Sequence, residues 1–102
     1  MTPHGDASPG RFAPDGNRWQ FAGTLTFRDA GAIFTASEQL PLPASGIVDL
    51  RGLVHADSSA LAVLLALKRR AAAERIPLSF EAMPAALDSL ARVYGVELLL
   101  TP

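Results

Sequence analysis

Residues 46–75 constrain the fold more than any other part of the chain, because they join a short apolar run to a polar corner and a long Ala/Leu-rich run. The apolar run from Ile47 to Leu50 is broken only by Asp49, as expected of a strand that is covered on both faces. The Ala/Leu-rich run is typical of a helix. Asp57 and the two serines after it carry short side-chain oxygens, which can accept hydrogen bonds from the free N–H groups of a first helical turn. The sequence therefore predicts a buried strand, a turn and a helix that begins at these polar residues.

The N-terminal part of the chain has a different character. Residues 1–17 contain three prolines and three glycines, and after the initial methionine their one large apolar side chain is Phe12. Such a segment buries too little surface to offset its ordering entropy, so we expect a flexible tail and place the ordered domain at residues 18–102. Within residues 18–27, large apolar side chains recur at alternating positions, with Ala22-Gly23 between two short runs. This pattern predicts a tight pair of strands.

The rest of the chain alternates between helical and strand patterns. Apolar residues at helical spacing follow Asp29 and stop before Pro41, and a second helical stripe follows Pro84. Short apolar or alternating runs at residues 78–82 and 96–100 predict two further strands. The expected element order is β-β-α-β-α-β-α-β, an α/β fold with a mixed, mostly parallel sheet covered by helices.

Composition narrows the classes of function. The chain of 102 residues has no cysteine, and neither of its two histidines has another at ligand spacing, so we expect no thiol catalysis, no disulfide and no metal site. Its net charge of −1 is spread along the chain, which argues against binding to nucleic acid or to an anionic membrane. No segment approaches the ~20 apolar residues of a membrane span, and no Gly-rich phosphate loop is present. We therefore expect a cytoplasmic protein that needs no cofactor.

The central stretch resembles the signature of the STAS family. An apolar strand that ends in Val48-Asp49-Leu50 is followed by a corner and then, at the start of a helix, by Asp57-Ser58-Ser59-Ala60-Leu61-Ala62. STAS domains are small cytoplasmic domains of sulfate transporters and anti-sigma-factor antagonists, and the resemblance over residues 19–100 implies the same fold. The segments WQFAGTLTFRDA and AALDSLARVYGVELLL are most similar to the MlaB branch, the STAS subunits of Mla phospholipid-transport ABC complexes.

The MlaB-like branch implies a non-catalytic subunit, peripheral to the inner membrane, that docks on the ATPase of the transporter and stabilises or activates it. The resemblance assigns the important hydroxyl to Ser58. The family usually has glycine where this chain has Ala60, and the added methyl group bears on how closely a partner can approach. The helix carries more apolar side chains than packing against one sheet requires, and these side chains extend the candidate surface. The alternative is that a neighbouring helix covers them. The candidate partner-binding residues are Asp57, Ser58, Ser59, Ala60, Val63 and Leu67.

A phosphorylation switch is a second hypothesis for the same corner. In anti-sigma-factor antagonists, a partner serine kinase modifies a serine at this place, and the resemblance assigns that role to Ser59, with Ser58 as the other candidate. A phosphate would be held by the free N–H groups and the positive end of the helix, and roughly two added charges beside Asp57 would alter any interface there. Simple helix capping explains the same residues without regulation. A hydrolase that uses a serine with His55 is a third reading, for which no orienting carboxylate stands at a recognisable spacing.

Overall fold

A mixed four-stranded sheet forms the centre of the computed structural model, which describes residues 9–100. Strands β1 (Arg11–Asp15) and β2 (Arg18–Leu25) are antiparallel, whereas β3 (Ile47–Ala56) runs parallel to β2, and β4 (Ser79–Glu81) runs parallel to β3. The spatial order is β1-β2-β3-β4. The prediction of an α/β fold with a mixed, mostly parallel sheet is confirmed.

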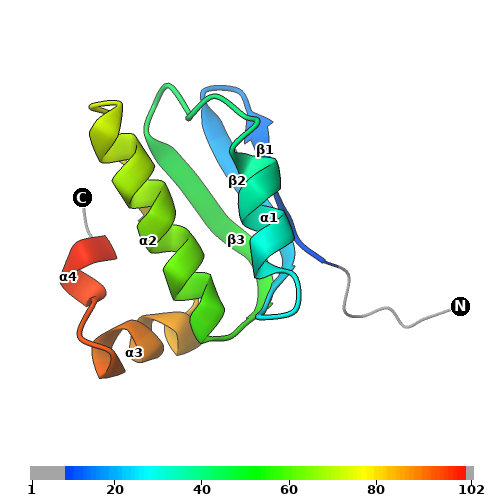
Figure 1. Cartoon of the computed structure of the whole chain (residues 1–102), viewed down its shortest axis with the longest axis vertical. Coiled ribbons are helices and arrows are strands. Elements are labelled where there is room, and N and C mark those ends of the chain that lie inside the picture. Colours follow the sequence, from blue (N-terminus) through cyan, green and yellow to red (C-terminus); the bar gives the residue numbers. More distant parts are fainter. Residues whose placement is uncertain (1–8, 101–102) are drawn as a thin grey trace, which may run out of the picture.

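Within residues 9–100, four helices accompany the sheet: α1 (Ala30–Ser37), α2 (Ser58–Ala73), α3 (Ala85–Val93) and α4 (Glu97–Leu100). Figure 1 shows α1 and α2 side by side across one face of the sheet, with α3 and α4 along the other flank of α2. The described residues contain no helix that is both long enough and apolar enough to cross a membrane.

The last element differs from the prediction. Residues 96–100 were expected to form a strand, but the chain turns at Gly95, where φ is +71°, and enters the short helix α4. Leu100 then inserts into the core with 5% of its surface exposed. A short apolar run fits a buried strand and a buried helical turn equally well, so its periodicity did not distinguish the two. The observed order is β-β-α-β-α-β-α-α.

The N-terminal hairpin also differs from the prediction. Residues 18–27 do not contain two strands; β2 is continuous from Arg18 to Leu25 and pairs with β1 across a turn at Gly16. β1 lies within the segment expected to be a flexible tail, and its Phe12 packs against Trp19 and Phe21 with ring centroids 5.6 and 4.8 Å apart. The sheet therefore begins before the expected boundary at residue 18, and residues 1–8 of the expected tail lie outside the described residues.

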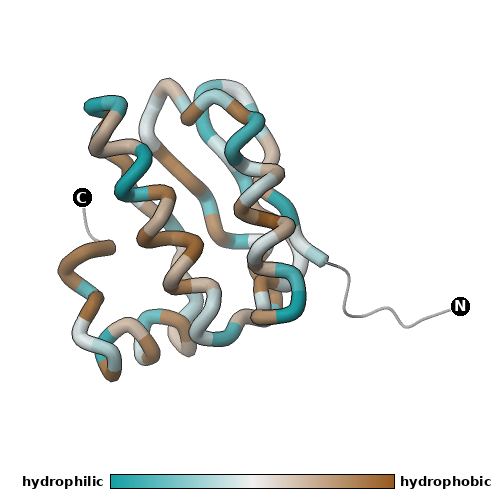
Figure 2. Tube along the Cα trace, viewed as in Figure 1, coloured by the Kyte–Doolittle hydropathy of each residue, from teal (hydrophilic) through white to brown (hydrophobic). Residues whose placement is uncertain are grey.

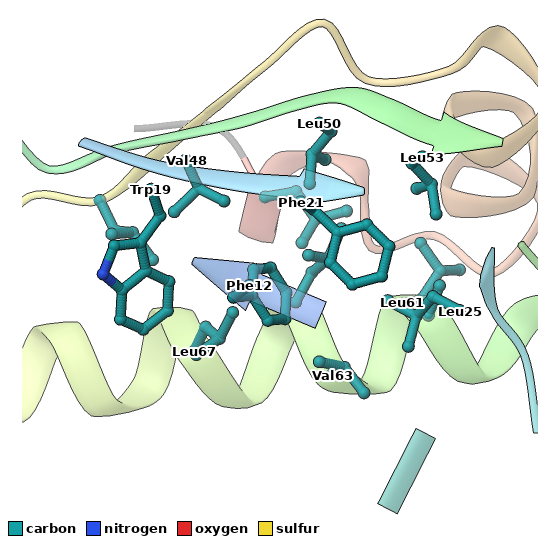
Figure 3. Packing of buried hydrophobic residues seen from close by; sticks show 14 of the residues in the cluster. Phe12, Trp19, Phe21, Leu25, Val48, Leu50, Leu53, Leu61, Val63 and Leu67 are labelled. Carbon is teal, nitrogen blue, oxygen red and sulfur yellow. The ribbon is translucent and has the colours of Figure 1, made fainter. Parts of the chain in front are cut away.

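The hydrophobic core lies between one face of the sheet and the two covering helices. Leu50 of β3 and Leu64 and Leu67 of α2 are completely buried, and Figure 3 shows side chains of β2, β3 and α2 pointing toward one another. Figure 2 shows hydrophobic segments within the first half of α2 and hydrophilic segments in its second half. Burial of one large apolar side chain stabilises a fold by ~1.5–3 kcal/mol, so this layer supplies the main driving force.

In the part of the chain that the structure describes, helices cover only one face of the sheet (Figure 1), contrary to the expectation that β3 is covered on both faces. Gln20 and Ala22 of β2 and Arg51 of β3 are exposed on or beside the opposite face. On that face Arg18 of β2 forms an ion pair with Glu81 of β4, across the intervening β3. The apolar run around Asp49 did not indicate that this face lacks a covering helix. Asp49 lies on that face but is itself buried at 7% exposure, and it accepts a hydrogen bond from the N–H of Arg51.

Candidate functional site

The corner between β3 and α2 is organised by the carboxylate of Asp57. Its Oδ1 accepts hydrogen bonds from the N–H and the hydroxyl of Ser59, at 2.9 and 2.5 Å. Its Oδ2 accepts a hydrogen bond from the N–H of Phe27 at 2.8 Å, in the loop between β2 and α1. Asp57 is therefore the N-cap of α2, as the sequence suggested, and it also joins α2 to a loop 30 residues earlier in the chain.

The hydrogen bonds of Asp57 determine its charge. Partial burial raises the pKa of this carboxyl, but hydrogen bonds from Ser59 and Phe27, together with the nearby His55, outweigh burial and leave the pKa below its ordinary value. Asp57 is consequently ionised at neutral pH. The three-bond arrangement, which we call the Asp57 clasp, depends on that negative charge.

The two serines at the corner have different environments. Ser58 is exposed and is the first residue of α2. Ser59 is half-buried, and its hydroxyl donates to Asp57. A partner surface can thus meet Ser58 directly, whereas any chemistry at Ser59 must first break its bond to the clasp.

The remaining candidate residues lie in the core. Ala60 and Leu67 have no exposed surface, and Val63 is 5% exposed. The idea that Val63 and Leu67 form an exposed apolar face is therefore wrong, and the alternative of covered side chains holds for both. The physical reason is that α2 packs against the sheet on one side and beside α1 on another, so more than one stripe of the helix is covered. The methyl group of Ala60 is likewise buried.

A shallow apolar groove between α1 and α2 was missed by the sequence analysis. Its volume is about 250 Å³, Val63 contributes to its lining, and Ser59 stands at one end. The spacing of Ala62 and Ala66, small residues four apart on one helix face, was the available signal, since small side chains leave space above them. The groove is lined by Ala30, Gly31, Phe34, Ser59, Ala62, Val63 and Ala66.

Exposed apolar side chains flank the same corner. Phe27 follows β2 and is 84% exposed, and Val54 on β3 is 72% exposed. Val54 points outward because the pairing of β2 with β3 shifts between Gly23 and Thr24, which leaves Val54 as an extra residue in β3. A bulge of this kind cannot be read from alternating hydrophobicity. The corner thus combines a charged clasp, an accessible hydroxyl and unpaired apolar surface.

Catalytic and metal chemistry find little support in this geometry. The Ser59 hydroxyl donates to Asp57 rather than to His55, and His55 is exposed on β3. Among residues 9–100, no three His, Cys, Asp or Glu side chains converge into a group that could hold a metal ion. The corner combines a hydrogen-bonded backbone with exposed apolar side chains.

Comparison with known families gives one finding. A family model described as the STAS domain of MlaB matches residues 12–101, which include β1 from its second residue onward, the Asp57 clasp and α4. A search of curated proteins with the same chain returns no match.

Proposed function

The chain belongs to the STAS family, in the branch described as MlaB, and on that premise we propose that it is a non-catalytic subunit of an Mla-type ABC transporter. STAS domains are in general regulatory and non-catalytic. In this role the protein binds the ATPase subunit at the cytoplasmic face of the inner membrane and stabilises or activates it. The complex moves phospholipids and so maintains the lipid asymmetry of the outer membrane.

One observation carries the proposal: the MlaB-type match spans a corner that presents Ser58 on a rigid support. Asp57, immediately before it, is fixed by three hydrogen bonds to two segments of the chain. A rigid support lowers the entropy cost of docking, because the contacting residues are already ordered before the partner arrives. The groove between α1 and α2 lies next to this corner and adds apolar surface for the ATPase.

A charge placed at Ser58 tests the proposal. We expect Ser58→Lys to weaken binding to the Mla-type ATPase of the same organism by at least roughly tenfold, because a long charged side chain must then be desolvated at the interface. The dissociation constant is measured by isothermal titration calorimetry, and ATP hydrolysis by the complex is followed in parallel. Ala73→Lys is the matched control: it adds the same charge to an exposed position of α2, about 22 Å along the helix from Ser58.

The two outcomes are distinct. Weakened binding by Ser58→Lys with normal binding by Ala73→Lys supports docking at the corner. Equal affinity of both variants and the unmodified protein would remove Ser58 from the interface. If the unmodified protein does not bind the ATPase at all, the transporter role itself is wrong.

A second candidate function is a phosphorylation switch at Ser59, of the anti-sigma-factor-antagonist type. The specific observation in its favour is the 2.5 Å hydrogen bond from the Ser59 hydroxyl to the Asp57 carboxylate. A phosphate on that oxygen would bring roughly two negative charges against Asp57, so the clasp would have to open. Incubation with the serine kinases of the host, followed by intact-mass analysis of the protein and of Ser59→Ala, checks this. A phosphate adduct that is absent from Ser59→Ala supports the switch, and an unchanged mass with every kinase contradicts it.

A further inference from the structure

The Asp57 clasp fixes a residue that is outside the sequence-derived site, namely Phe27. The backbone N–H of Phe27 donates to Oδ2 of Asp57 at 2.8 Å, while its side chain is 84% exposed. A large aromatic side chain so exposed leaves most of its apolar surface in water. Its backbone, however, is held in place by a charge-assisted hydrogen bond, so the exposed ring does not stand on a free loop.

The surroundings of Phe27 are ordered on both sides along the chain. Thr26 accepts hydrogen bonds through its carbonyl from the N–H groups of Asp29 and Ala30, at 3.0 and 2.9 Å, which form the turn into α1. Asp57 donates through its own N–H to the carbonyl of Leu25 at 3.4 Å, so Asp57 contacts both the last residue of β2 and the loop that follows it. Phe27 is thus presented between the first turns of α1 and α2, at the end of the fold that also carries Ser58.

We propose that Phe27 is the aromatic anchor through which the corner docks on an apolar pocket of the ATPase, and that Asp57 is the residue that positions it. The partner named here rests on the proposed function. Aromatic side chains in ordered positions are the residues that most often dominate interface energetics, because they bury a large area at little entropy cost. A modification at Ser59 that opens the clasp would release Phe27, which links the serine to the docking surface through one carboxylate.

Two pairs of variants separate anchoring from positioning. Phe27→Ala removes the ring, and its control is Val93→Ala, which truncates an apolar side chain of similar exposure (78%) on α3. Asp57→Asn retains an N-cap oxygen for Ser59 but replaces the other acceptor by an amide NH₂, which cannot accept from Phe27. Its control is Asp29→Asn, which removes one negative charge from the β2–α1 connection at a side chain that makes no capping hydrogen bond.

The affinity for the ATPase and the exchange of the Phe27 amide with deuterated solvent are both measured. We expect Phe27→Ala to weaken binding by at least roughly tenfold. Asp57→Asn should accelerate exchange of the Phe27 amide and weaken binding several-fold, with the far-UV circular dichroism of α2 retained. Val93→Ala and Asp29→Asn should match the unmodified protein in both measurements.

The results that overturn the inference differ from those that overturn the proposed function. If the unmodified protein does not bind the ATPase, the proposed function fails. If it binds but Phe27→Ala binds equally well, Phe27 is not the anchor. If Phe27→Ala weakens binding but Asp57→Asn alters neither amide exchange nor affinity, Asp57 does not position it. If light scattering shows a dimer that Phe27→Ala dissociates, the ring docks on a second copy and the ATPase pocket is wrong.

Discussion

The two halves of β3 perform different tasks although they belong to one strand. In the first half, Val48 pairs with Trp19 on one side and with Phe80 on the other, and Val48 and Leu50 have no exposed surface. In the second half, β4 has ended and β3 pairs with β2 alone through two shifts of register. The regular half belongs to the core, and the irregular half leads to the exposed corner at Asp57.

The difference shows how β3 changes from a strand that packs in the core to a segment that leads to the exposed corner. The first shift places an extra residue in β3 between Asp49 and Gly52, so Leu53 rather than Gly52 enters the core. Gly52 itself is needed here, because an added Cβ would lie 2.5 Å from the backbone oxygen of Phe21. Bulges redirect side chains at the cost of regular pairing. We therefore expect the first half to dominate stability, and the exposed positions of the second half, such as Val54, to tolerate substitution.

The largest expected effect comes from a matched pair of truncations in the two halves. Leu50→Ala removes a completely buried side chain and should lower the free energy of unfolding by about 2–5 kcal/mol. Val54→Ala removes a side chain that is 72% exposed and should change it by less than about 0.5 kcal/mol. Urea unfolding with linear extrapolation measures both. A loss at Val54 comparable to that at Leu50 would show that the second half is also part of the stabilising core.

The sequence predicted the regular half of β3 and the start of α2 because the signals there are local. An apolar run and an Asp before an Ala/Leu-rich segment act over a few residues, and both Ile47 and Ser58 begin the expected elements. β1 was missed because the burial of Phe12 depends on Trp19 and Phe21 across a hairpin, in a segment rich in proline and glycine. Val63 was misjudged for a related reason, since its burial depends on how α1 is placed.

The intermediate effect concerns the corner where the irregular half ends. Asp57→Ala removes the N-cap of α2 and the acceptor for Phe27, and should destabilise the fold by about 1–2 kcal/mol, more than an exposed site such as Val54. Thermal and urea unfolding measure the change, with Asp29→Ala as the control because Asp29 caps α1 without a side-chain bond. If the two alanine variants are equally stable, the clasp contributes nothing beyond the helix itself.

The pH dependence of stability isolates the charge of the same clasp. The pKa of Asp57 is lower in the folded state than its unfolded value near 3.9. The unfolded state therefore binds the proton more readily, so the contribution of Asp57 is complete above about pH 4 and is lost as the pH falls through the folded pKa. The stability difference between the unmodified protein and Asp57→Asn should shrink in that acidic range. A difference that stays constant down to pH 2 would contradict an ionised clasp.

The smallest expected effect concerns the outer face of the sheet, and whether an ion pair there adds to the stability of the regular half of β3. The Arg18–Glu81 ion pair crosses that half from β2 to β4, but its side chains are 34% and 49% exposed, so water and salt screen the attraction. Glu81→Gln keeps the shape and an acceptor oxygen, and should cost about 0.2–1 kcal/mol at low salt and less in 1 M salt. Urea unfolding at the two salt concentrations measures this, and Asp88→Asn is the control because its partner Arg92 lies on α3. A loss for Glu81→Gln that approaches the loss for Leu50→Ala would mean that the ion pair, rather than burial beneath α2, holds β3 between its neighbours.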